Sequence, residues 1–199
     1  MYASEPDLAK EGSAQRLGSP PSDLAAANRM SPAGISMFYG ATDVDTAIAE
    51  IGAHSSYTHA VVGEFTPVRE LRLLNLAGLN KLPKPSLFDQ GQHKAFFATK
   101  FLREFVADLT KPIELDGREH IDYVPTQVFT EYLKTAHPGR LDGLMFPSAQ
   151  NDSGSNVVIF CGPEHCASNG SEGKYSRLSL DPATVVKYRV TTVIRRSGK

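Results

Sequence analysis

An arginine, a tyrosine and a glutamate follow one another closely in the stretch RMSPAGISMFYGATDVDTAIAEI, residues 29–51. Arg29 can hold phosphate oxygens with two parallel N–H groups, and Tyr39 can stack on a flat heteroaromatic ring. Glu50 can stabilise the positive charge that develops on a ribose when its glycosidic bond breaks. Together these side chains suit a ligand with phosphates, a ribose and a flat cationic base, such as NAD⁺. The structural alternative is a surface ion pair, a core tyrosine and a glutamate at a helix edge.

The predicted elements around this stretch place the three residues on consecutive parts of the chain. The apolar run 35–41 predicts a buried strand. Thr42 can cap a helix that follows, with Asp45 three residues further on. Apolar residues then recur at helical spacing, namely Val44, Ala47, Ile48 and Ile51. Glu50 is expected beside this apolar face rather than opposite to it.

The rest of the chain predicts a mixture of strands and helices. Strands are expected at 57–65, 71–76, 141–148, 155–160 and 184–194, and helices at 93–109 and 125–136. The small polar stretch 149–154 is expected to be a loop, and 166–176 a flexible loop. Strands and helices mix without βαβ regularity, which favours an α+β fold.

Length and composition indicate one globular domain. The 199 residues, 41% of them hydrophobic and 22% charged, are enough for a sizeable core. Residues 1–15 lack periodicity, so we expect a flexible tail followed by a single domain at 16–199.

The same totals argue against several settings. The net charge of −1 gives no electrostatic reason to expect direct nucleic-acid or membrane binding. No apolar run approaches the roughly 20 residues that span a bilayer. The N-terminus lacks the features of a secretory signal, and two cysteines do not make a disulfide framework. A cytoplasmic setting is therefore expected, although a toxin delivered without a signal peptide would look the same.

Other motifs of catalytic or cofactor-binding proteins are incomplete. GSEGKYS at 170–176 lacks the spacing of a phosphate-binding loop, and no GxGxxG supports a Rossmann site. MFPSAQ at 145–150 is not a nucleophile elbow. Cys161, His165 and Cys166 offer up to three zinc ligands, whereas a structural site usually has four in two separated pairs. Neither a bound metal nor a bound cofactor is expected.

Three blocks of sequence resemble the RES domain family, which takes its name from an arginine, a glutamate and a serine. The first comprises NRMSPAG at 28–34, FYGA at 38–41 and TAIAE at 46–50; the second is YVPTQ at 123–127; the third is DGLMFPS at 142–148, followed by NVVIF at 156–160. They occur in the family's order. Two positions depart from its pattern, because Asn28 replaces a glycine and Ser31 an asparagine. Asn tolerates backbone shapes that Gly favours, whereas Ser31 lacks an amide that could orient a neighbour or the ligand.

The resemblance implies a fold like that of ADP-ribosyltransferases, with a split β-sheet and flanking helices around an NAD⁺ cleft. It implies that NAD⁺ is the substrate, and that Arg29, Tyr39, Glu50 and Ser148 act on it as catalytic residues. Arg29, Ser31, Tyr39, Gln127 and Asn156 are the expected ligand contacts. It also implies a toxin of a toxin–antitoxin pair that a protein antitoxin or immunity partner silences.

The resemblance leaves the final acceptor of ADP-ribose open between water, phosphate and a protein side chain. Transferases that modify arginine often carry a second carboxylate two residues before the catalytic one. Ile48 stands at that position, which argues mildly against such a transfer. Two further alternatives are an inactive module that binds a nucleotide without turnover, for which Ser31 is the only support, and an effector domain cut from a longer chain.

Overall fold

The computed structural model describes residues 2–52, 57–111 and 119–191. Its helices are α1 (Leu8–Glu11), α2 (Ala14–Leu17), α3 (Val44–Gly52), α4 (His93–Thr110), α5 (Glu119–Asp122) and α6 (Val124–Thr135). Its strands are β1 (Phe38–Ala41), β2 (His59–Val62), β3 (Phe65–Pro67), β4 (Leu73–Asn75), β5 (Gly143–Pro147), β6 (Ser155–Ile159), β7 (Cys166–Ser168), β8 (Leu178–Leu180) and β9 (Val186–Arg189).

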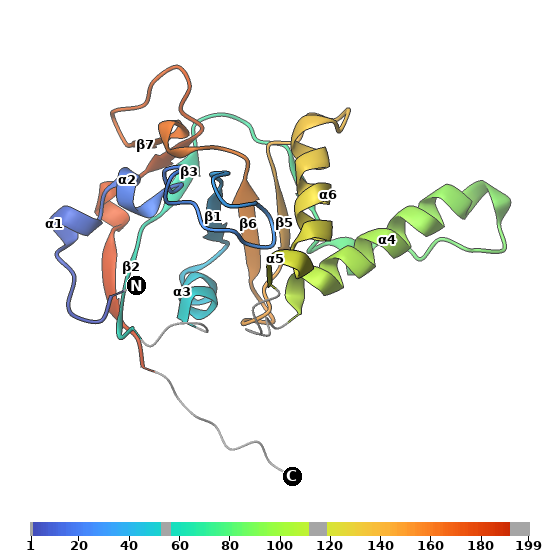
Figure 1. Ribbon diagram of the computed structural model, residues 1–199, viewed down its shortest axis with the longest axis horizontal. Helices are drawn as coiled ribbons and strands as arrows, with labels where there is room; N and C mark the ends of the chain where they lie inside the picture. The colour runs from blue at the N-terminus through green and yellow to red at the C-terminus, as the bar shows by residue number, and fades with distance from the viewer. Residues whose placement is uncertain (1, 53–56, 112–118, 192–199) are drawn as a thin grey trace, which may run out of the picture.

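The strands form separate hydrogen-bonded sheets. The central sheet has the order β1-β6-β5-β4, in which β4 is parallel to β5 and the other pairs are antiparallel. β2 pairs with β9, and β3, β8 and β7 form a third sheet. Helix α3 contacts β1, β2 and β6, while α4 contacts β5 and α6. Figure 1 shows α6 beside the central sheet and the N-terminal half of α4 projecting away from it. The fold is α+β, as the sequence predicts.

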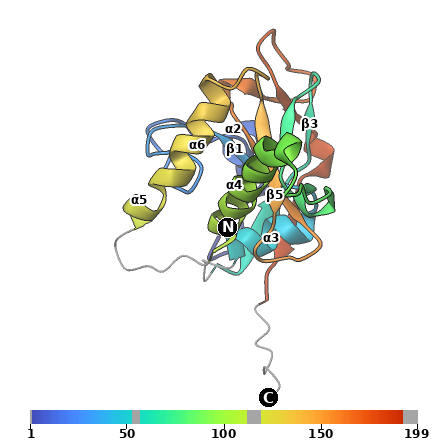
Figure 2. The ribbon, with the colours of Figure 1, turned by 90° about the vertical axis from the view of Figure 1, so that its right-hand side faces the viewer.

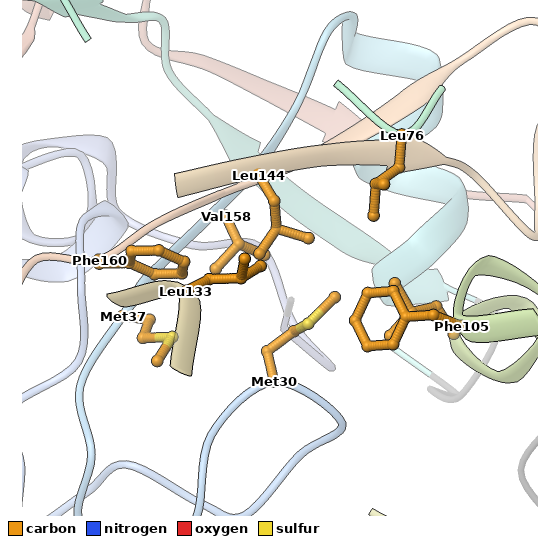
Figure 3. Packing of buried hydrophobic residues seen from close by; sticks show 9 residues of the cluster. Met30, Met37, Leu76, Phe105, Leu133, Leu144, Val158 and Phe160 are labelled. Carbon is orange, nitrogen blue, oxygen red and sulfur yellow. The ribbon is translucent and has the colours of Figure 1, made fainter. Parts of the chain in front are cut away.

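One face of the central sheet carries the larger core. Leu144 and Val158 lie directly opposite each other on β5 and β6, and both are almost completely buried. Figure 3 shows Met30 lying close to this pair, between Phe105 of α4 and Leu133 of α6. Burying a side chain of this size stabilises the fold by about 1.5–3 kcal/mol. The loop that contains Met30 is therefore anchored in the core. Figure 2 shows α6 beside α4, which is seen nearly along its axis.

The opposite face carries a smaller core. Phe38 and Ile159 are paired residues of β1 and β6, and they pack with Cys161, Cys166 and Leu178. The Phe38 ring meets Phe65 of β3 edge-to-face, with centroids 4.9 Å apart. This cluster joins the central sheet to the sheet of β3, β7 and β8.

Most predicted elements are confirmed, with small shifts at their ends. β1, β4, β5 and β6 each lie inside a predicted strand, and α4 and α6 differ from the predicted helices by one residue. The helix start at α3 is different. Asp43, not Thr42, caps it, because the Asp43 carboxylate accepts the Thr46 N–H at 2.8 Å. The Thr42 hydroxyl instead accepts a bond from the Ser155 N–H. The end of the strand expected at 184–194 lies outside the described residues.

Three segments differ from the sequence-based expectation. The single strand predicted at 57–65 is divided, because β2 ends at Val62 and Phe65 begins β3, which belongs to another sheet. Residues 2–15 are not an irregular tail, since they contain α1 and the start of α2, and the Tyr2 N–H donates to the His59 carbonyl at 2.8 Å. Ala14 is only 1% exposed. In the expected loop 166–176, the first residues form β7, which pairs with β8. The elements α1, α2 and β7 are too short to give a periodic pattern, so tertiary contacts determine whether they form.

No helix in the described part of the chain is long and apolar enough to cross a lipid bilayer.

Candidate active site

A cavity opens beside the central sheet. Its volume of about 560 Å³ is typical of a site for a small ligand. Its wall combines the loop at 28–30, β1, α3, the end of α4, Tyr123 and the ends of β5 and β6. Three of the sequence-predicted catalytic residues, Arg29, Tyr39 and Glu50, line it together. Tyr39 and Ile51 are 42% and 55% exposed, so apolar surface faces the open space.

The register of the central sheet explains why distant residues meet at this cavity. Ala41, Asn156 and Phe146 lie directly opposite one another on β1, β6 and β5. Directly opposite residues point to the same face of a sheet. Tyr39 is two residues from Ala41 and therefore shares that face. The sheet thus presents an aromatic ring, an amide and a second aromatic ring to one cavity.

Glu50 is held on the cavity wall by three donors. Its Oε1 atom accepts hydrogen bonds from Ser148 Oγ at 2.5 Å, Asn156 Nδ2 at 2.8 Å and the Ala149 N–H at 3.2 Å. Hydrogen bonds to a carboxylate are charge-assisted and roughly twice as strong as neutral ones. Within the described part of the chain, Oε2 accepts no hydrogen bond. Three donors thus fix one oxygen of a carboxylate that lines the cavity. We call Glu50, Ser148, Ala149 and Asn156 the carboxylate cluster.

Ser148 supports Glu50 and is not itself among the residues that line the cavity. It is 8% exposed. Its Oγ donates to Glu50 and accepts the N–H groups of Gln150 and Asn151 at 3.1 and 3.0 Å. The sequence predicts a catalytic Ser148, and the structure places it one hydrogen bond behind the carboxylate.

The loop at 28–31 is folded by its own asparagine, and we call it the arginine loop. Asn28 Oδ1 accepts the N–H groups of Met30 at 2.8 Å and Ser31 at 3.1 Å, which is the turn that Asn side chains favour. The same oxygen accepts the Tyr39 hydroxyl at 2.6 Å. Asn28 therefore ties the loop to β1, and the departure from the family's glycine has a structural role.

Arg29 faces the cavity from this loop and also closes the end of α4. Its guanidinium donates to the main-chain carbonyls of Asp108 and Lys111, and it lies 5.8 Å from the Tyr123 ring centre. A cation at a helix C-terminus satisfies free carbonyls and opposes the helix dipole. Since a guanidinium carries five N–H donors, these bonds leave others for a ligand. Arg29 thus has a structural contact in addition to the expected role.

Tyr39 presents its ring to the cavity while its hydroxyl is held in the arginine loop. Ser31 Oγ lies 3.0 Å from that hydroxyl. Burial raises the pKa of Tyr39, and the hydrogen bonds with Ser31 and Asn28 oppose the rise. The hydroxyl is therefore neutral near pH 7, and its ring can pack on a flat ligand.

Two of the expected ligand contacts lie behind the wall rather than on it. Ser31 is only 1% exposed and is absent from the cavity lining. Gln127 donates through Nε2 to the carbonyls of Asn28 at 2.7 Å and Ser31 at 3.2 Å, and it does not line the cavity either. Both side chains are used to hold the arginine loop. Asn156 does line the cavity, as expected.

Sequence reasoning missed several lining residues. Tyr123, Phe146 and Lys111 all contribute to the cavity wall. Tyr123 and Phe146 stand inside the blocks YVPTQ and DGLMFPS, so the blocks themselves were the signal for them. Lys111 follows the last residue of α4, and nothing in its local sequence distinguishes it from a solvated lysine.

The two cysteines belong to the opposite face of the sheet. Both are free and buried, and both approach Ser19 Oγ, Cys161 Sγ at 3.8 Å and Cys166 Sγ at 3.5 Å. A hydrogen bond with Cys166, together with burial, raises the pKa of the Cys161 thiol. Among the described residues, no group of three or more His, Cys, Asp and Glu side chains could hold a metal ion.

The fold and the cavity define an α+β domain in which an arginine, a tyrosine and a triply hydrogen-bonded glutamate line one concave site. The chain belongs to the RES domain family, whose model matches residues 9–181. Membership is consistent with an NAD-related module of toxin–antitoxin systems. No curated protein and no solved structure matches the chain.

Proposed function

We propose that this protein cleaves the bond between nicotinamide and ribose in NAD⁺ and thereby depletes NAD⁺ as a toxin. The observation that carries the proposal is the carboxylate cluster, in which three donors fix one oxygen of Glu50 and Glu50 lines the cavity. A fixed carboxylate is suited to positive charge that develops only in the transition state. Arg29 and Tyr39 line the same cavity and match the phosphates and the flat base of the ligand.

The chemistry needs little beyond positioning and charge. When the C–N bond breaks, its electron pair goes to nicotinamide, which is cationic in NAD⁺ and leaves as a neutral molecule. The ribose carbon becomes oxocarbenium-like, and Glu50 Oε2 stabilises that charge. Water then adds to this carbon and loses a proton, which gives ADP-ribose, nicotinamide and H⁺. Because the leaving group departs neutral, neither a metal nor a general acid is needed, and NAD⁺ is the substrate rather than a bound cofactor.

The other residues have separate parts in this scheme. Tyr39 packs on the nicotinamide ring, and Arg29 binds the phosphate or ribose side with the donors that the α4 carbonyls leave free. Asn156 orients Glu50 and contacts the ligand, whereas Ser148 acts through Glu50. Phosphate can replace water as the acceptor, and Ile48 at the transferase position argues against transfer to arginine. A protein antitoxin that silences the activity in the cytoplasm is part of the same proposal.

The test is chromatography of the products that the purified chain forms from NAD⁺, with and without phosphate. We expect nicotinamide with ADP-ribose, or with its 1-phosphate when phosphate is the acceptor. Glu50→Gln keeps an oxygen for the three donors and removes only the charge, so nicotinamide release should fall by about 10²–10³-fold. Glu131→Gln, on an exposed part of α6, is the matched control.

Two results would contradict the proposal. Equal rates for the wild-type chain and Glu50→Gln would remove the catalytic role of Glu50. Tight calorimetric binding of NAD⁺ without any release of nicotinamide would favour an inactive binding module instead.

A further inference from the structure

We propose that Asn151 is a positioning residue, which fixes the loop at 148–154 on helix α3 through Thr46 and so keeps the Ser148 hydroxyl on Glu50. None of the motifs discussed above includes Asn151. The effect on turnover rests on the proposed function, whereas the effect on the loop does not. The name "148–154 loop" is used below for this segment between β5 and β6.

The anchor of the loop is a chain of hydrogen bonds that ends on a buried hydroxyl. Asn151 Nδ2 donates to Thr46 Oγ1 at 2.8 Å, and that hydroxyl donates to the Asp43 carboxylate at 2.7 and 2.8 Å. Thr46 is completely buried. A hydroxyl that accepts one bond and donates another polarises both, so the chain is stronger than its separate bonds. Hydrogen bonds from Thr46 also lower the pKa of Asp43, chiefly the bond from the Thr46 N–H and then the bond from its hydroxyl. The carboxylate at the end of this series of hydrogen bonds therefore stays charged.

The same loop is closed on Ser148 by main-chain groups. The Asn151 and Gln150 N–H groups donate to Ser148 Oγ, and the Asn151 carbonyl accepts the Gly154 N–H at 3.0 Å. The Ser148 N–H in turn donates to the Gly154 carbonyl at 3.0 Å. Any displacement of Asn151 therefore moves the donors that hold the Ser148 hydroxyl. That hydroxyl is one of the three groups on Glu50.

Thr46 and Glu50 are four residues apart on α3, so their side chains are neighbours on one face of the helix. The loop thus holds the helix at two adjacent points, Asn151 on Thr46 and Ser148 on Glu50. Gly154 shows how closely the two approach, since a Cβ atom there would lie 1.8 Å from Thr46 Oγ1. Only glycine allows this contact, so the loop packs directly on the helix at Thr46.

The test compares Asn151→Ala with Asp152→Ala, a neighbour on the same loop with an exposed side chain. Asn151→Ala should lower kcat about tenfold with little change in KM, because a small misplacement of a catalytic group costs turnover rather than binding. Thr46→Val should behave like Asn151→Ala, and Thr46→Ser, which keeps the hydroxyl, should restore most of the rate. Asp152→Ala should match the wild-type chain.

Two further measurements separate positioning from general destabilisation. If Asn151 acts through Ser148, the variant with both Ser148→Ala and Asn151→Ala should be no more than about twofold slower than Ser148→Ala alone. Amide hydrogen exchange at residues 149–151 should rise about tenfold in Asn151→Ala while the core amides stay protected.

Additive kinetic effects, or unchanged exchange at 149–151 in Asn151→Ala, would overturn the proposal. If the wild-type chain released no nicotinamide, the proposed function would fail, and hydrogen exchange would still decide the role of Asn151.

Discussion

The carboxylate cluster and the arginine loop line the same cavity but are built in different ways. The carboxylate cluster joins α3 to the 148–154 loop and β6, whose donors are 98 and 106 positions from Glu50 in the chain. The arginine loop is folded mainly by Asn28, through bonds to residues two and three positions away. The first therefore depends on tertiary packing, and the second on a local turn that Gln127 reinforces. Four substitutions can test this contrast, from the largest expected effect to the smallest.

Replacing Asn156, one of the three donors to Glu50, by an acidic residue should have the largest effect. Asn156→Asp puts a carboxylate where an amide lies 2.8 Å from Glu50 Oε1. The two charges repel each other, so the cluster should open and nicotinamide release should fall about 10²–10³-fold. Asn75→Asp is the matched control, because the Asn75 side chain accepts a bond from the Gly78 N–H, as an aspartate can. A rate for Asn156→Asp above about a third of the wild-type value would contradict this account.

Changing the cation of the arginine loop should have the second-largest effect. Arg29→Lys keeps the charge but replaces the planar guanidinium, which donates to the two carbonyls through two separate nitrogens, by a compact ammonium that lacks this fork geometry. We expect kcat/KM for NAD⁺ to fall about 10–100-fold, mostly through KM. Steady-state kinetics at constant ionic strength measures the split. Arg16→Lys, at an exposed ion pair with Glu11, is the control. A loss carried by kcat alone would place Arg29 at the reacting centre instead.

Removing the support of the arginine loop should reduce stability more than chemistry. Gln127→Ala removes the side-chain donor from the carbonyls of Asn28 and Ser31, and only the Ser31 carbonyl keeps a main-chain donor, the Asn28 N–H, among the described residues. We expect a cost of about 1–3 kcal/mol in the free energy of unfolding. Urea denaturation followed by circular dichroism measures that loss, and Gln15→Ala at an exposed position is the control. The KM for NAD⁺ should rise while kcat changes little. An unchanged unfolding midpoint would show that Asn28 folds the loop without help.

The smallest effect is expected outside both regions, at the ion pairs that hold the start of β5. Burial acts to raise the pKa of Asp142, but hydrogen bonds from Arg69 and the Arg72 N–H outweigh it and lower that pKa overall. A lowered carboxyl pKa stabilises the fold above the unfolded value near 4, and this contribution is lost as the pH falls through the folded pKa. Asp142→Asn should cost about 1 kcal/mol near pH 7 and less in acid.

Thermal unfolding from pH 2 to pH 7 measures the stability of the Asp142→Asn variant and of the wild-type chain at each pH. Asp152→Asn, at an exposed loop position, is the control and should follow the wild-type curve. A difference between Asp142→Asn and the wild-type chain that stayed constant across this range would show that the lost interaction is not the charge of Asp142.

The sequence by itself determined the elements and the residue types of the site. Regular apolar spacing predicted the helices α3, α4 and α6 and the strands of the central sheet, because a buried face needs apolar residues at the period of the helix or strand. Arg29, Tyr39, Glu50 and Asn156 were identified from their chemistry and from three blocks, and the structure brings them to one cavity. Short elements such as α1 and β7 gave no pattern, since packing rather than periodicity stabilises them.

Only the tertiary structure decided which residues touch the cavity and which stand behind it. Ser31 and Gln127 belong to the blocks, yet both are used to hold the arginine loop. Ser148 acts through Glu50, and Asn151 reaches Thr46 across 105 positions of the chain. Such contacts depend on sheet register and on how a loop docks on a helix. The sequence determines the type of each side chain, but its hydrogen-bond partner is determined only when distant elements pack together.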